Sequence, residues 1–122
     1  MDAALETGLE ATYEFEAEGA LLTDVGGTLP QQVLSTPGMI AMMERTAARL
    51  VYPVVGEGKA TVGFEVCVKH VGGAVEGTRL VARARLEEIV DGRKLRFSVE
   101  VQTDDGRTIG VGTHERRIVE TR

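Results

Sequence analysis

The sequence predicts an α+β fold in which one central helix packs against a five-stranded antiparallel sheet. Two observations favour this fold: a single helical segment begins near residue 36, and four strand-like segments joined by turn signals follow it. One further strand precedes the helix. With 122 residues, 43% of them hydrophobic, we expect one domain spanning residues 1–122.

The first strand is predicted from residues 8–17, where apolar and polar side chains alternate. One face carries Leu9, Ala11, Tyr13, Phe15 and Ala17. The segment from Gly19 to Gln32 then contains three glycines and one proline. It is expected to be a long loop, and such loops in compact domains are often functional.

The helix is predicted to begin at Thr36-Pro37, a hydroxyl N-cap followed by proline at the first helical position. It should end near Val51, before Pro53. At about 100° per residue, one face is apolar and lies opposite two arginines. The apolar face consists of Met39, Ile40, Met43, Ala47, Leu50 and Val51.

Four strands are predicted after the helix, over residues 60–71, 78–90, 94–102 and 108–119. Gly72-Gly73, Asp91-Gly92 and residues 104–106 mark the turns between them, and Asp-Gly pairs are typical of hairpins. Long hairpin-linked strands would wrap around the single helix. This arrangement is the hot-dog fold.

Composition excludes several classes of function. The net charge of −5 argues against a general nucleic-acid binder, which needs a positive surface. Basic residues within 79–85, 93–96 and 116–117 either contact one phosphorylated cofactor or form solvated strand faces. No apolar run approaches the ~18 residues of a membrane span, and the first residues lack signal-peptide features. We therefore expect a cytoplasmic protein with no membrane partner.

Metal and thiol chemistry is also not expected. Cys67 is the only cysteine, so an internal disulfide and a cysteine-based metal cage are impossible. We expect Cys67 to be a buried packing residue of a strand. The two histidines are 44 residues apart, so no metal site is predicted.

Glu44 and His70 are polar residues where the apolar pattern would not place them. Glu44 sits ~40° from Ile40 at the edge of the apolar stripe, and is either a boundary residue reaching water or a general base. By period two, His70 shares a strand face with Val62, Phe64, Val66 and Val68, the face expected to meet the helix. It is either a satisfied structural histidine or a catalytic one.

Thr36 is the third candidate. It has a structural use as the N-cap, but a helix start also collects free backbone amides and stabilises negative charge. Amides near Gly38 and Met39 could receive a substrate carbonyl oxygen as it becomes an oxyanion, and Gly38 would allow close approach. Thr36 and Glu44 lie eight residues apart, so the side chains of both should face the sheet. A hydroxyl, a carboxylate and an imidazole near such a helix end form an acyl-transfer constellation.

Three segments resemble the fluoroacetyl-CoA thioesterase family of hot-dog proteins: residues 35–44 (STPGMIAMME), 66–70 (VCVKH) and 110–116 (GVGTHER). The resemblance implies a thioester hydrolase that converts a small acyl-CoA to free acid and coenzyme A. It implies Thr36, Glu44 and His70 as the catalytic set, with Gly63 near the thioester carbonyl. His114 also matches, and we interpret it as structural or rim-lining. No cofactor is implied beyond the coenzyme A of the substrate.

The resemblance further implies a homodimer, or a tetramer built from it, whose sheets join edge to edge with coenzyme A at the subunit interface. The family's fluoroacetyl specialist has an aromatic-rich lid, whereas residues 26–32 here contain no aromatic residue. We therefore expect a short or medium acyl group, or a small aryl group, rather than fluoroacetyl.

Two other functions remain open. The first is a non-catalytic acyl-CoA-binding hot-dog protein, in which the same pocket holds ligand without turnover. The second is an enoyl-CoA hydratase of this fold. It is disfavoured because the residue five before His70 is Glu65 rather than aspartate, and Glu65 is expected on the opposite strand face.

Overall fold

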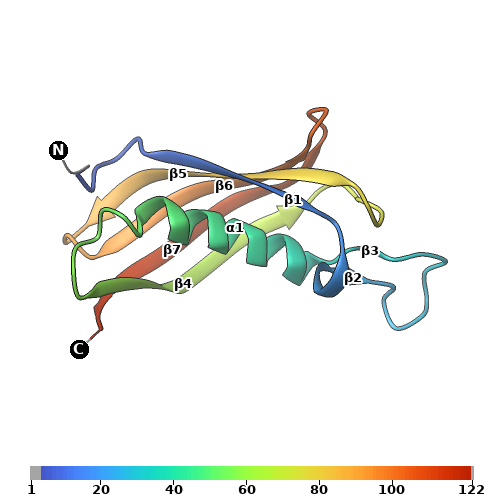
Figure 1. The fold of residues 1–122 in the computed structure, drawn as a ribbon, viewed down its shortest axis with the longest axis horizontal. Coiled ribbons are helices and arrows are strands. Elements are labelled where there is room, and N and C mark those ends of the chain that lie inside the picture. Colours follow the sequence, from blue (N-terminus) through green and yellow to red (C-terminus); the bar gives the residue numbers. More distant parts are fainter. Residues whose placement is uncertain (1–3, 122) are drawn as a thin grey trace.

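The computed structural model describes residues 4–121 and has one helix lying across a five-stranded antiparallel sheet (Figure 1). The strand order is β1-β5-β6-β7-β4, so β1 and β4 form the two edges. The elements of this layer pair are β1 (Glu10–Glu16), α1 (Thr36–Val51), β4 (Lys59–His70), β5 (Arg79–Val90), β6 (Lys94–Thr103) and β7 (Thr108–Glu120). The predicted α+β architecture is confirmed, with the bounds of the five strands of this sheet within two residues of those expected at every end.

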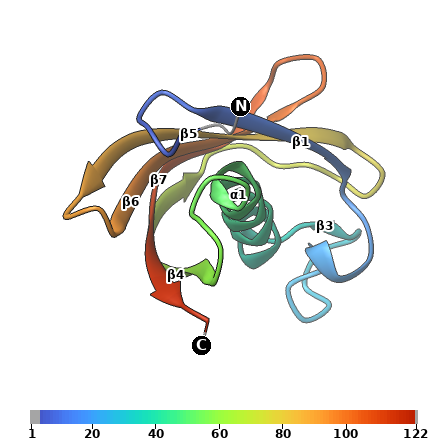
Figure 2. The same ribbon diagram turned by 60° about the vertical axis from the view of Figure 1, so that its left-hand side comes forward.

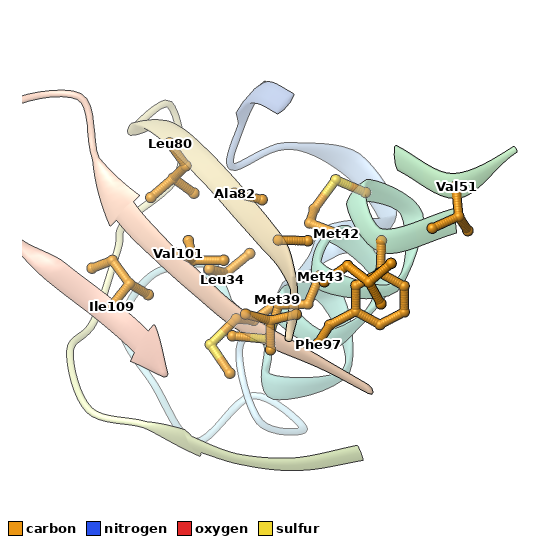
Figure 3. Close-up of a cluster of buried hydrophobic side chains, with 14 of the residues drawn as sticks. Leu34, Met39, Met42, Met43, Val51, Leu80, Ala82, Phe97, Val101 and Ile109 are labelled. Atoms are coloured by element: carbon orange, nitrogen blue, oxygen red, sulfur yellow. The ribbon is translucent and has the colours of Figure 1, made fainter. Parts of the chain in front are cut away.

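The sheet curves around α1 (Figure 2). The apolar core lies between the helix and the sheet. Met39, Met42 and Met43 from α1 pack with side chains from the middle strands (Figure 3). The fully buried members of the sheet include Leu80, Leu86, Leu95, Phe97, Val101 and Ile109. Burial of these side chains is the main stabilising contribution to the fold. Within residues 4–121, no helix is long and apolar enough to cross a membrane.

The buried face of α1 differs from the predicted stripe. Met42 and Thr46 are buried, whereas Ile40 and Leu50 are only half-buried. Because the sheet wraps around the helix, it covers a wider part of the helix surface than a flat sheet would. The covered part is also rotated about the helix axis from the predicted stripe. Thr46 tolerates burial because its hydroxyl donates to the carbonyl of Met42 at 2.7 Å.

The helix cap is Ser35, so the prediction of Thr36 as N-cap is wrong. Ser35 has extended backbone geometry, and its Oγ accepts a hydrogen bond from the Gly38 amide at 2.9 Å. Thr36 is instead the first helical residue, followed by Pro37. Its hydroxyl is therefore free for a contact outside the helix.

The predicted long loop is partly ordered by a small second sheet. A 3₁₀ turn, η1 (Gly19–Leu21), leads into β2 (Leu22–Thr23), which pairs with β3 (Val33–Leu34). This ribbon lies beside the start of α1 (Figure 2). Gly38 is buried against the end of η1, because a Cβ on Gly38 would lie 2.6 Å from the Leu21 carbonyl oxygen. The absent side chain of Gly38 thus allows η1 to pack closely on the start of the helix.

Strand β4 contains a bulge that changes which of its residues face the helix. The register with β7 shifts between Gly63 and Glu65, so Phe64 is the extra residue. Beyond the bulge, His70 lies opposite Gly110, whose missing side chain makes room for Met39 of α1. The prediction of one continuous apolar face is therefore wrong, because the bulge moves Phe64 off the helix-facing side.

Strand β4 exposes large apolar side chains near the edge of the sheet. Val62 is 48% exposed and Phe64 is 59% exposed, with the Arg117 guanidinium 3.5 Å from the centre of the Phe64 ring. Cys67 is also exposed, so the prediction of a buried packing residue is wrong. It lies opposite Thr113 on the sheet face directed away from α1, and among residues 4–121 no strand pairs with the other edge of β4.

Candidate active site

Thr36 and His70 meet where α1 starts and β4 ends. Thr36 Oγ1 lies 2.8 Å from His70 Nδ1, a hydrogen bond across 34 residues of sequence. In Figure 1 the first turn of α1 and the arrowhead of β4 lie at the same end of the molecule. Together with Val71, Gly72 and Gly73, the pair lines a shallow hollow that is open to solvent. A hydroxyl bonded to an imidazole at an accessible hollow can act as an activated nucleophile or hold a water.

The second nitrogen of His70 has an unusual environment. Nε2 is buried and has no hydrogen-bond partner among the described residues. Buried polar atoms are nearly always satisfied, so an unpaired one at a candidate site requires an explanation. If Nδ1 accepts the Thr36 proton, Nε2 carries the ring hydrogen, which fixes the tautomer needed for a general base.

The amides predicted to be free at the helix start already have partners. The Gly38 amide donates to Ser35 Oγ, and the Met39 amide donates to the Ser35 carbonyl at 2.9 Å. Both residues are also buried. Substrate binding by Gly38 and Met39 stays a prediction, and in this conformation both amides donate to Ser35, one to its side chain and one to its carbonyl.

Glu44 lies two helical turns further along α1, where it faces a glycine of the sheet. A Cβ on Gly63 would be only 2.7 Å from Glu44 Oε2, so the carboxylate occupies the space of the missing side chain. Glu44 Oε2 is also 3.9 Å from Arg116 Nη1, and its side chain remains 40% exposed. Gly63 therefore belongs beside Glu44 rather than beside Thr36.

Arg116 and His114 extend this second cluster into the sheet. The Arg116 guanidinium donates to Thr61 Oγ1 at 2.9 Å and to the Thr61 carbonyl at 3.0 Å. Its Nη1 lies 3.2 Å from His114 Nε2, and His114 Nδ1 lies 2.8 Å from the Glu65 carbonyl. A guanidinium and a carbonyl can only donate and accept respectively, so His114 is neutral with its hydrogen on Nδ1.

The predicted trio is thus divided within one chain. Thr36 and His70 are in contact, but Glu44 is eight residues, or about 12 Å, further along the helix. Gly63 is separated from His70 by most of β4, roughly 20 Å of strand. One chain carries two half-sites: Thr36 with His70, and Glu44 with Gly63 and Arg116.

A family model described as fluoroacetyl-CoA-specific thioesterase matches residues 18–122. The chain belongs to this thioesterase family. The fluoroacetyl-CoA thioesterase of Streptantibioticus cattleyicolor is 32% identical over 88 residues, which cover 72% of this chain and 62% of that relative. The match therefore spans less than two thirds of the curated relative's length.

Solved structures of thioesterases share the whole fold. A structure of the fluoroacetyl-CoA thioesterase matches 98% of this chain and 91% of its own, with a TM-score of 0.84 and 25% identity. A Thermus thermophilus protein described as a thioesterase superfamily member matches 96% of this chain and 85% of its own, with a TM-score of 0.85 and 27% identity. The hot-dog fold is thus confirmed.

The position of Arg116 beside Glu44 was not predicted from the sequence. Arg116 was considered only among basic residues that might hold a phosphorylated cofactor or face solvent, yet it is 8% exposed. The available signal was its spacing: Arg116 lies two residues after His114 and so shares its strand face. His114 is 2% exposed, and its ring is stacked on that of Phe97 with the ring centroids 6.1 Å apart. Both observations agree with its expected structural role.

The free energy of unfolding is expected to decrease below pH 6.5 because of His114. Burial lowers the pKa of His114 below its ordinary value of 6.5, although the hydrogen bond with the Glu65 carbonyl partly opposes this. As the pH falls through 6.5, the unfolded chain binds a proton that the folded chain resists, so unfolding becomes more favourable. Urea unfolding at about pH 8 and about pH 5.5 should show a smaller decrease for His114→Gln than for wild type. Equal decreases in the two proteins would contradict this assignment.

Proposed function

We propose that this protein hydrolyses small acyl-CoA thioesters to a free acid and coenzyme A. The Thr36–His70 hydrogen bond is the observation that carries the proposal, since it supplies an activated hydroxyl at an open hollow in a thioesterase family member. The chemistry needs no metal and no cofactor apart from the coenzyme A of the substrate. Because acyl-CoA thioesters are made and used inside cells, we also propose a cytoplasmic location.

In the proposed reaction, Thr36 Oγ attacks the thioester carbonyl while its proton passes to His70 Nδ1. The tetrahedral adduct then expels the coenzyme A thiolate, which takes the proton from His70. Glu44 removes a proton from water as the water oxygen attacks the acyl-Thr36 ester. The C–O bond to Thr36 then breaks, the acid leaves, and the proton held by Glu44 returns to Thr36 Oγ. The thioester C–S bond is replaced first by an ester C–O bond and then by the carboxylic acid.

We propose a homodimer in which the exposed edges of two β4 strands pair antiparallel. An exposed edge strand with apolar side chains readily pairs with another chain. Pairing centred on Cys67 would place His70 opposite the bulge at Gly63 of the partner subunit. Both residues lie on the helix-facing side of the sheet, as directly opposed residues must. Glu44 of the partner subunit would then complete the Thr36–His70 half-site.

This dimer predicts a specific cross-link. Two Cys67 side chains directly opposite each other in an antiparallel pair would have Cβ atoms roughly 5 Å apart, close enough for mild oxidation to join them. We expect a disulfide-linked dimer on a non-reducing gel, and none with Cys67→Ser. A wild-type protein that is dimeric by light scattering but never cross-links would contradict pairing of the two β4 strands around Cys67. A tetramer that cross-links through Cys67 would still agree with this pairing.

Thiol release from a panel of acyl-CoA thioesters tests the enzymatic proposal. The panel contains acetyl-, fluoroacetyl-, butyryl-, hexanoyl- and phenylacetyl-CoA. We expect hydrolysis of several small acyl groups without a preference confined to fluoroacetyl, because residues 26–32 provide no aromatic lid. Measurable binding of these thioesters without any thiol release would favour the non-catalytic acyl-CoA-binding protein instead.

A further inference from the structure

Arg116 is a buried cation whose hydrogen bonds leave one side directed at Glu44. Nε and Nη2 both bond to Thr61, on the neighbouring strand β4. Nη1 lies 3.2 Å from His114 Nε2 and 3.9 Å from Glu44 Oε2. Among the described ion pairs, Arg116 is the only cation within 4.0 Å of the Glu44 carboxylate.

His114 holds the Arg116 guanidinium in place from the other side. Its Nδ1 hydrogen is committed to the Glu65 carbonyl, so the Nε2 lone pair points at Arg116. The ring is also stacked against Phe97 with an interplanar angle of 26°. Because Glu65 follows the β4 bulge, the same irregularity that places Gly63 under Glu44 also supplies the carbonyl that orients His114.

Glu44 is positioned from two directions by this arrangement. The missing side chain of Gly63 leaves space for its carboxylate, and the Arg116 charge lies on one side of that space. The side chain is half-exposed and long, so without an opposite charge nearby it would sample several rotamers. A fixed cation on one side favours a single orientation of the carboxylate.

We propose that Arg116, held by Thr61 and His114, is a positioning residue that keeps the Glu44 carboxylate aimed over Gly63. This inference rests on the proposed function, in which Glu44 activates water. Arg116 also links β4 to β7 through Thr61, so a purely structural role is the competing explanation. The two explanations differ in whether the effect of Arg116 depends on Glu44.

A double-mutant cycle separates them. Arg116→Met, which keeps length without charge, Glu44→Gln and the combined variant are assayed for thiol release from acetyl-CoA, or from the best substrate of the panel. Arg116→Met should lower kcat at least about tenfold in the wild-type background but less than about twofold in the Glu44→Gln background. Arg116→Lys, which keeps the charge, should recover a large part of the loss. Arg83→Met, on an exposed arginine paired with Glu100, is the surface control.

The outcomes distinguish a failure of the positioning role of Arg116 from a failure of the catalytic role of Glu44. Equal losses in both backgrounds, with Glu44→Gln itself impaired, would overturn the positioning role while leaving the proposed function intact. Wild-type hydrolysis by Glu44→Gln would overturn the role proposed for Glu44 in catalysis, and with it this inference. If Arg116→Met does not fold by circular dichroism, the cycle is run with Arg116→Gln, and the same comparison of backgrounds applies.

Discussion

Thr36→Ala is expected to lower kcat/KM about 10²- to 10⁴-fold, because it removes the hydroxyl that His70 activates. His70→Ala should cause a loss of similar size, and the double variant should be little worse than either single one. Residues that act as a unit show such non-additive effects. Thiol release measured with the most reactive acyl-CoA of the panel provides the comparison.

The controls for Thr36 follow from the helix cap. Thr36→Ser keeps a hydroxyl and should retain much more activity than Thr36→Ala. Ser35→Ala removes the cap to the Gly38 amide and should cost about 1 kcal/mol of stability, whereas Thr36→Ala should cost little. In Glu44→Gln, mass spectrometry should detect an acyl group on Thr36. A fully active Thr36→Ala, or the absence of any acylated protein, would contradict direct attack by Thr36.

Gly112→Ala is expected to destabilise the protein by about 3 kcal/mol or more, since overpacking against backbone cannot be relieved by a rotamer change. A Cβ on Gly112 of β7 would overlap the carbonyl oxygen of Cys67 and lie 2.6 Å from the Val68 Cα. Strand β4 would have to move away from β7, and His70 is two residues further along that strand. Chemical unfolding measures the loss.

Gly63→Ala is the matched comparison for Gly112→Ala. Its new Cβ would meet the flexible end of Glu44 rather than backbone. We therefore expect Gly63→Ala to fold with nearly wild-type stability but to lose activity, because the Glu44 carboxylate is pushed aside. Similar stability losses for the two variants would show that the space at Gly63 serves packing and not the site.

The helix and the strands could be predicted because the sequence patterns that indicate them are local. Alternation in residues 8–17, a proline at the helix start and Asp-Gly turns act over a few neighbouring residues. The β4 bulge could not be predicted in this way, since it depends on the register with β7, about 50 residues later. That single irregularity explains the wrong face assigned to Phe64.

The site was predictable in its residue types but not in its grouping. Thr36 and His70 meet as expected. Glu44 lies apart because eight residues of helix place it about 12 Å along the helix axis from Thr36. Choosing Ser35 over Thr36 as the cap depends on one backbone conformation, and both are hydroxyl residues. Arg116 could not be assigned to the site from sequence, because a buried arginine and a solvated one look alike there.

Subunit mixing tests the shared site most directly. Thr36→Ala and Glu44→Gln should each be nearly inactive as homodimers, but a heterodimer purified through two different tags contains one intact site, with Thr36 and His70 from one subunit and Glu44 from the other. We expect it to recover about half of the wild-type thioesterase activity, because a twofold-symmetric dimer has two equivalent sites. Heterodimers as inactive as both parents would contradict a site assembled from two subunits.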